Sequence, residues 1–257
     1  VTPKTKCNIC GGLVSIGGYE LHTWNDKYFK DTNMIDVIRR SDNTGMVFVA
    51  QKLGVGRMIS YLTKFGIGQL TDIDLQGEVA PSLKPKGEWY SVDLATAGFG
   101  QGISLTPIEL LSGFSAIANK GERLQPIVVA SVEMPDGKTI KIAPKVLSRP
   151  ISEKTAKVMI EILVNAVNKG EAQWTKLKGY RIAGKTGTAS IPVAGRYDPD
   201  KTIASFIGFA PADDPKFVML VILDKPTTSI YASETAAPIF FDIAKDILSY
   251  YGVPPSE

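Results

Sequence analysis

The sequence is poor in the residues that carry metal-dependent and histidine-dependent chemistry. Its 257 residues include one histidine, His22, and two cysteines, Cys7 and Cys10. A Ser-His-Asp or Cys-His mechanism would have to use His22, and a histidine-rich metal site is excluded. The cysteine pair is half of a four-ligand zinc site, and no second pair follows. We therefore expect no metal and no cofactor. We interpret the cysteines as a surface pair, which forms a disulfide if the domain works outside the cytoplasm.

A large excess of one charge and long apolar runs are also lacking. The balance of Lys plus Arg over Asp plus Glu is 29 − 26 = +3, which gives no reason to expect a nucleic-acid partner. The longest apolar run, residues 217–223, is far too short to span a bilayer. The hydrophobic share of 44% and the charged share of 21% are ordinary for a globular protein. A chain of this length can bury a core without metals or disulfides.

Hydrophobic periodicity predicts helices in the first part of the chain and strands later. Thr106 is expected to begin one helix as its N-cap, with Pro107 and Glu109 in the first turn. Other expected helices are 34–38, 44–53, 58–65, 152–169 and 234–251, with residues 66–105 rich in loops. The expected strands are 181–189, 202–209 and 217–223, with a hairpin of 128–132 and 139–142. Helices followed by an antiparallel sheet indicate an α+β fold.

Residues 179–188 support two incompatible interpretations. Residues 179–186 fit the phosphate-binding pattern G-x-x-x-x-G-K-[ST]. That motif needs a strand before it and a helix after it, so that helix N–H groups can hold phosphate. The preceding residues 169–178 are polar, and glycines and prolines follow the motif. We therefore set the phosphate-binding interpretation aside.

The second interpretation combines two tripeptides, Ser41-Asp42-Asn43 and Lys185-Thr186-Gly187. Ser-Asp-Asn and Lys-Thr-Gly are two of the three boxes of active-site serine enzymes that perform acyl transfer, and the third is Ser-x-x-Lys. Each tripeptide alone is weak evidence. Both together are much less expected by chance, because they occur in the right order, one between two helices and one on a strand.

With these boxes in place, the sequence resembles the transpeptidase domain of class B penicillin-binding proteins, which are peptidoglycan D,D-transpeptidases. The resemblance runs from about residue 18 to 251, and it is carried by stretches 41–45, 98–102, 105–110, 116–121, 183–189 and 204–211. It implies a β-lactamase/transpeptidase-like α+β fold, with an antiparallel sheet flanked by helices. It also implies stem peptides ending in D-Ala-D-Ala and β-lactams as ligands, no cofactor, and other cell-wall synthesis proteins as partners. The family works at the outer face of the bacterial cytoplasmic membrane, held by an N-terminal helix.

The resemblance also implies roles for individual residues. Lys185 would place positive charge toward the substrate carboxylate, and the hydroxyls of Thr186 and Thr188 would donate hydrogen bonds to it. The N–H of Thr188 would form half of the oxyanion hole, and Gly187 would leave room for the acyl group along the strand. Ser41 would relay a proton to the departing D-Ala nitrogen. Asn43 would hydrogen-bond the substrate amide and help to position the base.

Simpler structural roles exist for the same residues. Ser41 and Asn43 are residue types that cap helices, and one begins near Thr44. Lys185 is equally compatible with a solvated strand position. Asp42 is expected to face solvent or to act as a cap, and we assign it no chemistry. Three further residues have only structural interpretations: a turn for Gln101, and packing at a sheet edge for His22 and Trp24.

The third box is missing, because no serine in the chain is followed by a lysine three residues later. We expect the nucleophilic serine and its lysine base to lie before Val1, so that residues 1–257 are part of one transpeptidase domain without its Ser-x-x-Lys segment and inactive alone. Two alternatives remain open. One is a serine β-lactamase or β-lactam sensor of the same fold. The other is a non-catalytic module of this fold that only binds cell-wall peptides or partners.

Overall fold

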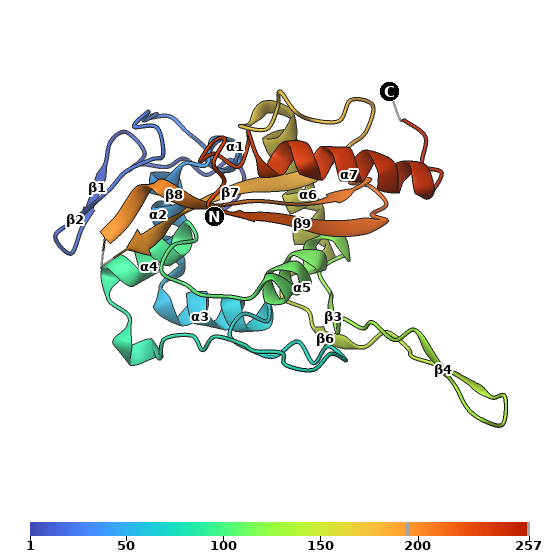
Figure 1. The fold of residues 1–257 in the computed structure, drawn as a ribbon. Coiled ribbons are helices and arrows are strands. Elements are labelled where there is room, and N and C mark those ends of the chain that lie inside the picture. The colour runs from blue at the N-terminus through green and yellow to red at the C-terminus, as the bar shows by residue number, and fades with distance from the viewer. Residues whose placement is uncertain (194–195, 256–257) are drawn as a thin grey trace.

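A three-stranded antiparallel sheet lies at the centre of the structure, a computed structural model that describes residues 1–193 and 196–255 (Figure 1). Its strands are β7 (Ala183–Val193), β8 (Arg196–Ala210) and β9 (Phe217–Asp224), in the order β7-β8-β9. All three were predicted from the sequence, and the antiparallel pairing of β8 with β9 is confirmed.

Helix α7 (Ala236–Tyr250) covers one face of this sheet (Figure 1). Phe206 of β8 packs against Phe240 and Phe241 of the helix, with ring centroids 4.5 and 5.2 Å apart. The three rings are buried. Each contributes roughly 1.5–3 kcal/mol to folding by leaving water, so this cluster fixes the helix on the sheet.

Helices α5 (Pro107–Ala118) and α6 (Glu153–Lys169) cover the opposite face. Successive strand residues point to opposite sides, so Phe209 faces away from the Phe206 cluster. It packs with Leu163 of α6 and Phe114 of α5. The predicted N-cap of α5 is confirmed, because Thr106 accepts a hydrogen bond from the Glu109 N–H and Glu109 caps Thr106 in return.

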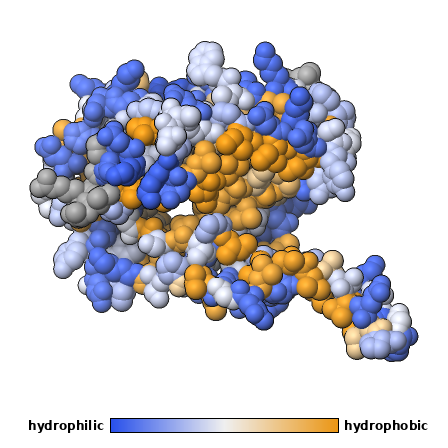
Figure 2. Space-filling model, in the orientation of Figure 1, coloured by the Kyte–Doolittle hydropathy of each residue, from blue (hydrophilic) through white to orange (hydrophobic). Residues whose placement is uncertain are grey.

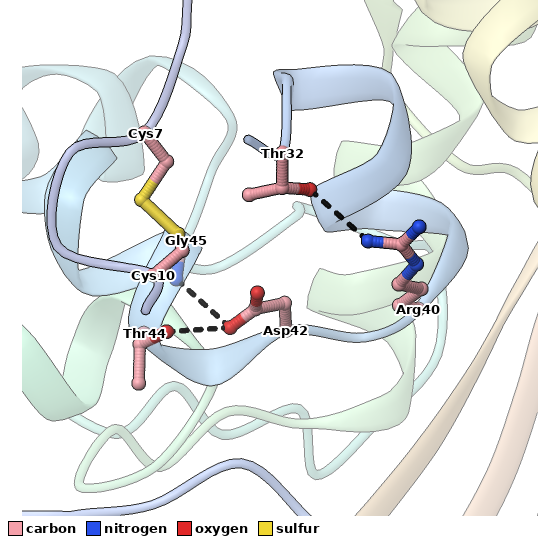
Figure 3. The surroundings of a disulfide bond; sticks show 7 residues. All are labelled: Cys7, Cys10, Thr32, Arg40, Asp42, Thr44 and Gly45. Atoms are coloured by element: carbon pink, nitrogen blue, oxygen red, sulfur yellow. Dashed lines mark hydrogen bonds between the residues drawn. A yellow bond between two sulfur atoms is a disulfide. The ribbon is translucent and has the colours of Figure 1, made fainter. Parts of the chain in front are cut away.

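A smaller core lies beneath α1 (Met34–Arg39) and α2 (Asn43–Leu53), where Cys7 and Cys10 form a disulfide (Figure 3). Both cysteines are buried and pack with Met34, Val37 and Phe48. The expectation of a surface pair was therefore wrong. The segment 1–32 folds back over α1 and α2, which the short polar stretches of this region did not reveal.

The remaining helices and strands lie outside the central sheet. They are β1 (Val14–Ile16), β2 (Tyr19–Leu21), α3 (Val55–Lys64), η1 (Lys86–Glu88), α4 (Ser91–Gly98), β3 (Arg123–Leu124), β4 (Ser131–Glu133), β5 (Thr139–Lys141) and β6 (Val146–Ser148). Helix α3 begins earlier than predicted, and α4 lies in a stretch predicted as loops. The glycine that suggested a loop, Gly98, ends α4 where a Cβ atom would lie 2.9 Å from the Met46 carbonyl of α2.

The hairpin of β4 and β5, predicted from the sequence, projects from the body of the molecule (Figure 1). Figure 2 shows apolar surface along this hairpin and over β9. In the part of the chain that the structure describes, no helix is both long and apolar enough to cross a membrane.

Candidate active site

The turn between α1 and α2 carries the first predicted tripeptide. Asp42, not Ser41 or Asn43, is the N-cap of α2: its carboxylate accepts hydrogen bonds from the Gly45 N–H at 3.1 Å and the Thr44 hydroxyl at 2.7 Å (Figure 3). Asp42 is buried and caps α2, which is the second of the two roles expected for it. Because Asp42 caps the helix, the side chains of Ser41 and Asn43 are not needed for that purpose.

Ser41 adopts an uncommon backbone conformation, with φ at +52°. A non-glycine residue in this left-handed region carries strain that the surrounding structure must support. The support comes from α1, since the Ser41 N–H donates to the Ile38 carbonyl and the Asp42 N–H donates to the Val37 carbonyl. The resulting geometry brings the Ser41 hydroxyl to the ammonium of Lys185, which donates a hydrogen bond to it.

Asn43 follows at the start of α2, where its side-chain N–H donates to the His22 carbonyl at 2.9 Å. This bond fixes the amide plane and leaves the oxygen Oδ1 without a partner among the described residues. His22 itself is partly exposed, and its ring contacts Asp26 at 3.0 Å and Tyr28 at 3.3 Å. The single histidine therefore contributes its backbone, and not its ring, to this region.

The second tripeptide lies in the middle of β7. Lys185 pairs with Ile207 and Gly187 with Ser205 of β8. A regular strand, with no helix following Lys185, is incompatible with the phosphate-binding motif. A Cβ atom on Gly187 would lie 2.6 Å from the Ser205 hydroxyl, so glycine leaves room for the Ser205 side chain beside β7.

Lys185 joins the two tripeptides. Its ammonium donates to the Ser41 hydroxyl and, at 3.0 Å each, to the carbonyl and hydroxyl of Thr186. Burial lowers the pKa of Lys185 from its ordinary value, and the charge of Glu171 opposes that shift. A solvated strand lysine would not make three hydrogen bonds to protein oxygens, so the simpler interpretation of Lys185 was wrong.

Glu171 was missed by the sequence analysis. It lies between α6 and β7, and its Oε2 accepts a hydrogen bond from the Thr186 hydroxyl at 2.8 Å. The hydroxyl proton that was expected to reach a substrate carboxylate is directed to Glu171 instead. Thr188, the second threonine expected to donate to the substrate, differs from Thr186. Its hydroxyl oxygen accepts from the Ala232 N–H at 3.2 Å, which leaves the hydroxyl proton free for a ligand. Glu171 was missed because a single acidic residue in a polar loop forms no motif that marks it as part of a site.

A cavity of about 470 Å³ opens in front of these side chains. All six predicted site residues line it: Ser41, Asn43, Lys185, Thr186, Gly187 and Thr188. Trp24 and Tyr231 form part of its wall, with ring centroids 5.7 Å apart, so Trp24 lies at the cavity and not at a sheet edge. Gln101 lies in a turn between two glycines with positive φ, as predicted, and also lines the cavity.

The cavity can bind an anionic group and move a proton. It presents one ammonium, several hydroxyls and strand N–H groups within a partly buried space. Within residues 1–193 and 196–255, no group of three or more His, Cys, Asp or Glu side chains is placed to hold a metal ion.

Comparison with known proteins places this geometry in context. Residues 1–247 match the family model described as the penicillin binding protein transpeptidase domain. Stage V sporulation protein D of Bacillus subtilis is 37% identical over 247 residues, which are 95% of this chain and 38% of that protein. The peptidoglycan D,D-transpeptidase FtsI of Buchnera aphidicola (subspecies Baizongia pistaciae) is 30% identical, over 99% of this chain and 43% of that protein. The chain thus spans about two fifths of the length of these relatives.

Solved structures agree in fold. Penicillin-binding protein 3 of Mycobacterium tuberculosis, complexed with ampicillin, superposes with a TM-score of 0.90 at 30% identity, over 99% of this chain and 59% of that one. The transpeptidase domain of penicillin-binding protein 3 from Burkholderia pseudomallei gives 0.88 at 30% identity, over all of this chain and 75% of that one. The predicted transpeptidase-like α+β fold is confirmed.

Proposed function

The chain belongs to the penicillin-binding protein transpeptidase family, and from that premise we propose that it is part of a serine D,D-transpeptidase that cross-links peptidoglycan stem peptides and is acylated by β-lactams. The observation that carries the proposal is the contact between the Lys185 ammonium and the Ser41 hydroxyl. It joins two catalytic boxes that are 144 residues apart, at the floor of a cavity.

In the proposed reaction, a serine hydroxyl adds to the carbonyl of the penultimate D-Ala of a stem peptide. The bond from that carbonyl to the last D-Ala nitrogen breaks, and the serine proton passes through Ser41 to this nitrogen, which leaves as free D-Ala. An ester to the serine remains. The amine of a second stem peptide then attacks the ester, the ester bond breaks, and the new amide cross-links the two peptides while the serine recovers its proton.

Each described residue has a part in that scheme. Lys185 holds the terminal carboxylate of the substrate by charge, and Thr188 donates its hydroxyl proton to the same group. The N–H of Thr188 stabilises the oxyanion, a contribution that is worth about 10²- to 10³-fold in related reactions. Gly187 leaves space for the acyl chain, and Asn43 offers its free Oδ1 to the substrate amide or to the base. Thr186 acts as a donor only if its hydroxyl turns away from Glu171.

The nucleophile is proposed to come from outside residues 1–257. The sequence has no Ser-x-x-Lys, and of the described residues that line the cavity, none of Ser41, Ser190 and Ser233 is followed by a lysine three positions later. The complete site then needs a further segment that carries this serine, its lysine base and the second N–H of the oxyanion hole. On this proposal the 257-residue chain alone forms no acyl-enzyme.

The ligands and the location follow from the same premise. Solved relatives are complexes with ampicillin and aztreonam, which supports β-lactams as ligands here, and the relatives named D,D-transpeptidases support stem peptides as substrates. The disulfide between Cys7 and Cys10 is typical of an oxidising compartment. It supports a location at the outer face of the cytoplasmic membrane. On the family premise, the membrane anchor and the contacts to other cell-wall synthesis proteins are proposed to lie outside these residues.

Labelled penicillin, read by intact mass, tests the proposal. The 257-residue chain is compared with a version extended upstream to include Ser-x-x-Lys, and circular dichroism establishes that both are folded. We expect a stoichiometric adduct on the extended version and none on the chain alone. An adduct on a serine of the chain alone would contradict the external nucleophile. No adduct on either folded protein would favour a non-catalytic module, and rapid loss of the adduct by hydrolysis would favour a β-lactamase.

A further inference from the structure

Glu171 is held at the site by the backbone around it. Gly170, the residue after α6, packs so closely that a Cβ atom would lie 2.2 Å from the Ala166 carbonyl and 2.7 Å from the Arg39 carbonyl. The loop is therefore fixed against the end of α1, two residues before Ser41. The next turn is closed by a hydrogen bond from the Gln173 N–H to the Gly170 carbonyl. The loop that carries Glu171 and the turn that carries Ser41 are thus both attached to the end of α1.

The contacts of Glu171 form a chain into the site. The Lys185 ammonium donates to the Thr186 hydroxyl at 3.0 Å, and that hydroxyl donates to Oε2 of Glu171 at 2.8 Å. The other carboxylate oxygen, Oε1, is buried and has no hydrogen-bond partner among the described residues. Leaving a carboxylate oxygen buried and unpaired costs free energy, so a purely structural role is a poor explanation for an acidic residue here.

Among the described residues, Glu171 is the acidic group that acts on Lys185, through the Thr186 hydroxyl and through its charge rather than by a direct ion pair. On the α1 side, Arg39 lines a small cavity together with Lys185 and Glu171, and it is paired with Asp36 at 2.8 Å. On the α1–α2 turn, Asp42 is engaged in capping α2. Among the described residues of the cavity wall, Tyr231, before α7, is the remaining titratable group. The carboxylate of Glu171 is the group whose charge favours the protonated form of Lys185.

We propose that Glu171 is a positioning residue that acts through Lys185: it holds the Thr186 hydroxyl in the orientation that receives the ammonium, and its carboxylate balances the charge of that ammonium until an anionic substrate or β-lactam takes over that task. This inference rests on the proposed function, because it assigns Lys185 to carboxylate binding. It adds a residue from outside the three catalytic boxes.

The first test measures Lys185 directly and needs no catalysis. The pKa of Lys185 is followed by NMR in the 257-residue chain with ¹³C at lysine Cε. Glu171→Gln keeps a hydrogen-bond acceptor for Thr186 but removes the charge, so the pKa of Lys185 should fall below its wild-type value. Glu171→Asp keeps the charge and should hold the pKa closer to that of wild type. Glu161→Gln is the matched control, because Glu161 lies on α6 and pairs with Arg181, away from the site. It should leave the pKa of Lys185 unchanged.

The second test follows penicillin acylation against pH in the upstream-extended protein. Carboxylate binding needs the protonated lysine, which is lost as pH rises through its pKa. The alkaline limb should therefore move to lower pH in Glu171→Gln and not in Glu161→Gln, with partial recovery in Glu171→Asp. A merely structural role would lower the rate at every pH without moving the limb.

The outcomes separate the two proposals. An unchanged pKa of Lys185 in Glu171→Gln, or equal pKa values in Glu171→Gln and Glu171→Asp, overturns the role of Glu171. A fallen pKa in the chain together with no acylation of the wild-type extended protein overturns the transpeptidase proposal and leaves the coupling of Glu171 to Lys185 intact. If Glu171→Gln does not fold, Glu171→Ala takes its place: a Lys185 pKa below that of wild type supports the role, and an unchanged pKa overturns it.

Discussion

Lys185 holds a charged ammonium group at a place where the group loses part of its hydration. Its ammonium is partly buried, and desolvation lowers its pKa. Protein oxygens from Ser41 and Thr186 replace the lost water. A buried charge of this kind contributes little to stability, so its position is better explained by the binding of an anion in the cavity than by folding.

Replacement of Lys185 by alanine tests that view at the residue scale. In the upstream-extended protein, Lys185→Ala should slow β-lactam acylation by about two orders of magnitude, as the loss of one preorganised electrostatic group does. The measurement is the second-order rate constant for labelled penicillin, with circular dichroism as evidence of folding. Lys178→Ala is the matched control, since Lys178 is exposed and makes no ion pair in the described structure. Equal rates for wild type and Lys185→Ala would remove Lys185 from the carboxylate site.

At the scale of elements, the N-terminus of α2 links folding to the site. Asp42 caps α2 and thereby leaves Ser41 and Asn43 free to face the cavity. The adjoining Gly45 lets α1 and α2 pack closely, because a Cβ atom there would lie 2.4 Å from a methyl carbon of Val37. The conformation of Ser41 is therefore a consequence of how two helices meet.

Removing the cap should destabilise the protein. Asp42→Ala deletes the acceptor for the Gly45 N–H and the Thr44 hydroxyl, and such losses typically cost about 1–2 kcal/mol. Asp42→Asn retains a good capping group and should cost less than half as much. Urea unfolding of the three proteins measures the difference. A cost for Asp42→Asn equal to that for Asp42→Ala would show that the carboxylate charge, and not the cap, is what matters.

The elements differ in how far the sequence could predict them. Helix α6 was predicted nearly to its ends, and the Thr106 capping box located α5. The three central strands were also predicted, but β7 extends to Val193 and β8 begins at Arg196, beyond the expected ranges 181–189 and 202–209. Helix α4 was missed because Gly98, which packs against α2, looks like a loop residue in the sequence alone. The two boxes gave five cavity residues and Thr188, which follows the second box, is the sixth, whereas Glu171, Trp24 and Tyr231 reach the cavity only through tertiary packing.

At the scale of the whole molecule, the site is assembled from segments that are distant in the chain. The α1–α2 turn supplies Ser41, the first residue of α2 is Asn43, the loop after α6 supplies Glu171, and β7 supplies Lys185. The sheet and α7 hold β7 in place, whereas the α1–α2 turn rests on the small core around the disulfide (Figure 3). The positions of Ser41 and Asn43 in the site therefore depend on the stability of this second core.

The disulfide should contribute measurably to that core. Cys7 and Cys10 are three residues apart, and closing so short a loop is worth roughly 2 kcal/mol in the chain-entropy account. Cys7→Ala/Cys10→Ala also removes buried sulfur atoms from contact with Met34 and Phe48. We expect the double variant to lower the free energy of unfolding by about 2 kcal/mol or slightly more, as measured by urea unfolding.

Reduction of the wild-type protein supplies the internal control for this prediction. Dithiothreitol should destabilise the wild type by most of the same amount and should leave Cys7→Ala/Cys10→Ala unaffected, since that variant has no thiol. If the reduced wild type is as stable as the oxidised protein, packing around the two cysteines, and not the covalent bond, holds the α1–α2 turn. In that case the site would keep its geometry in a reducing compartment, and the disulfide would lose its weight as support for an extracytoplasmic location.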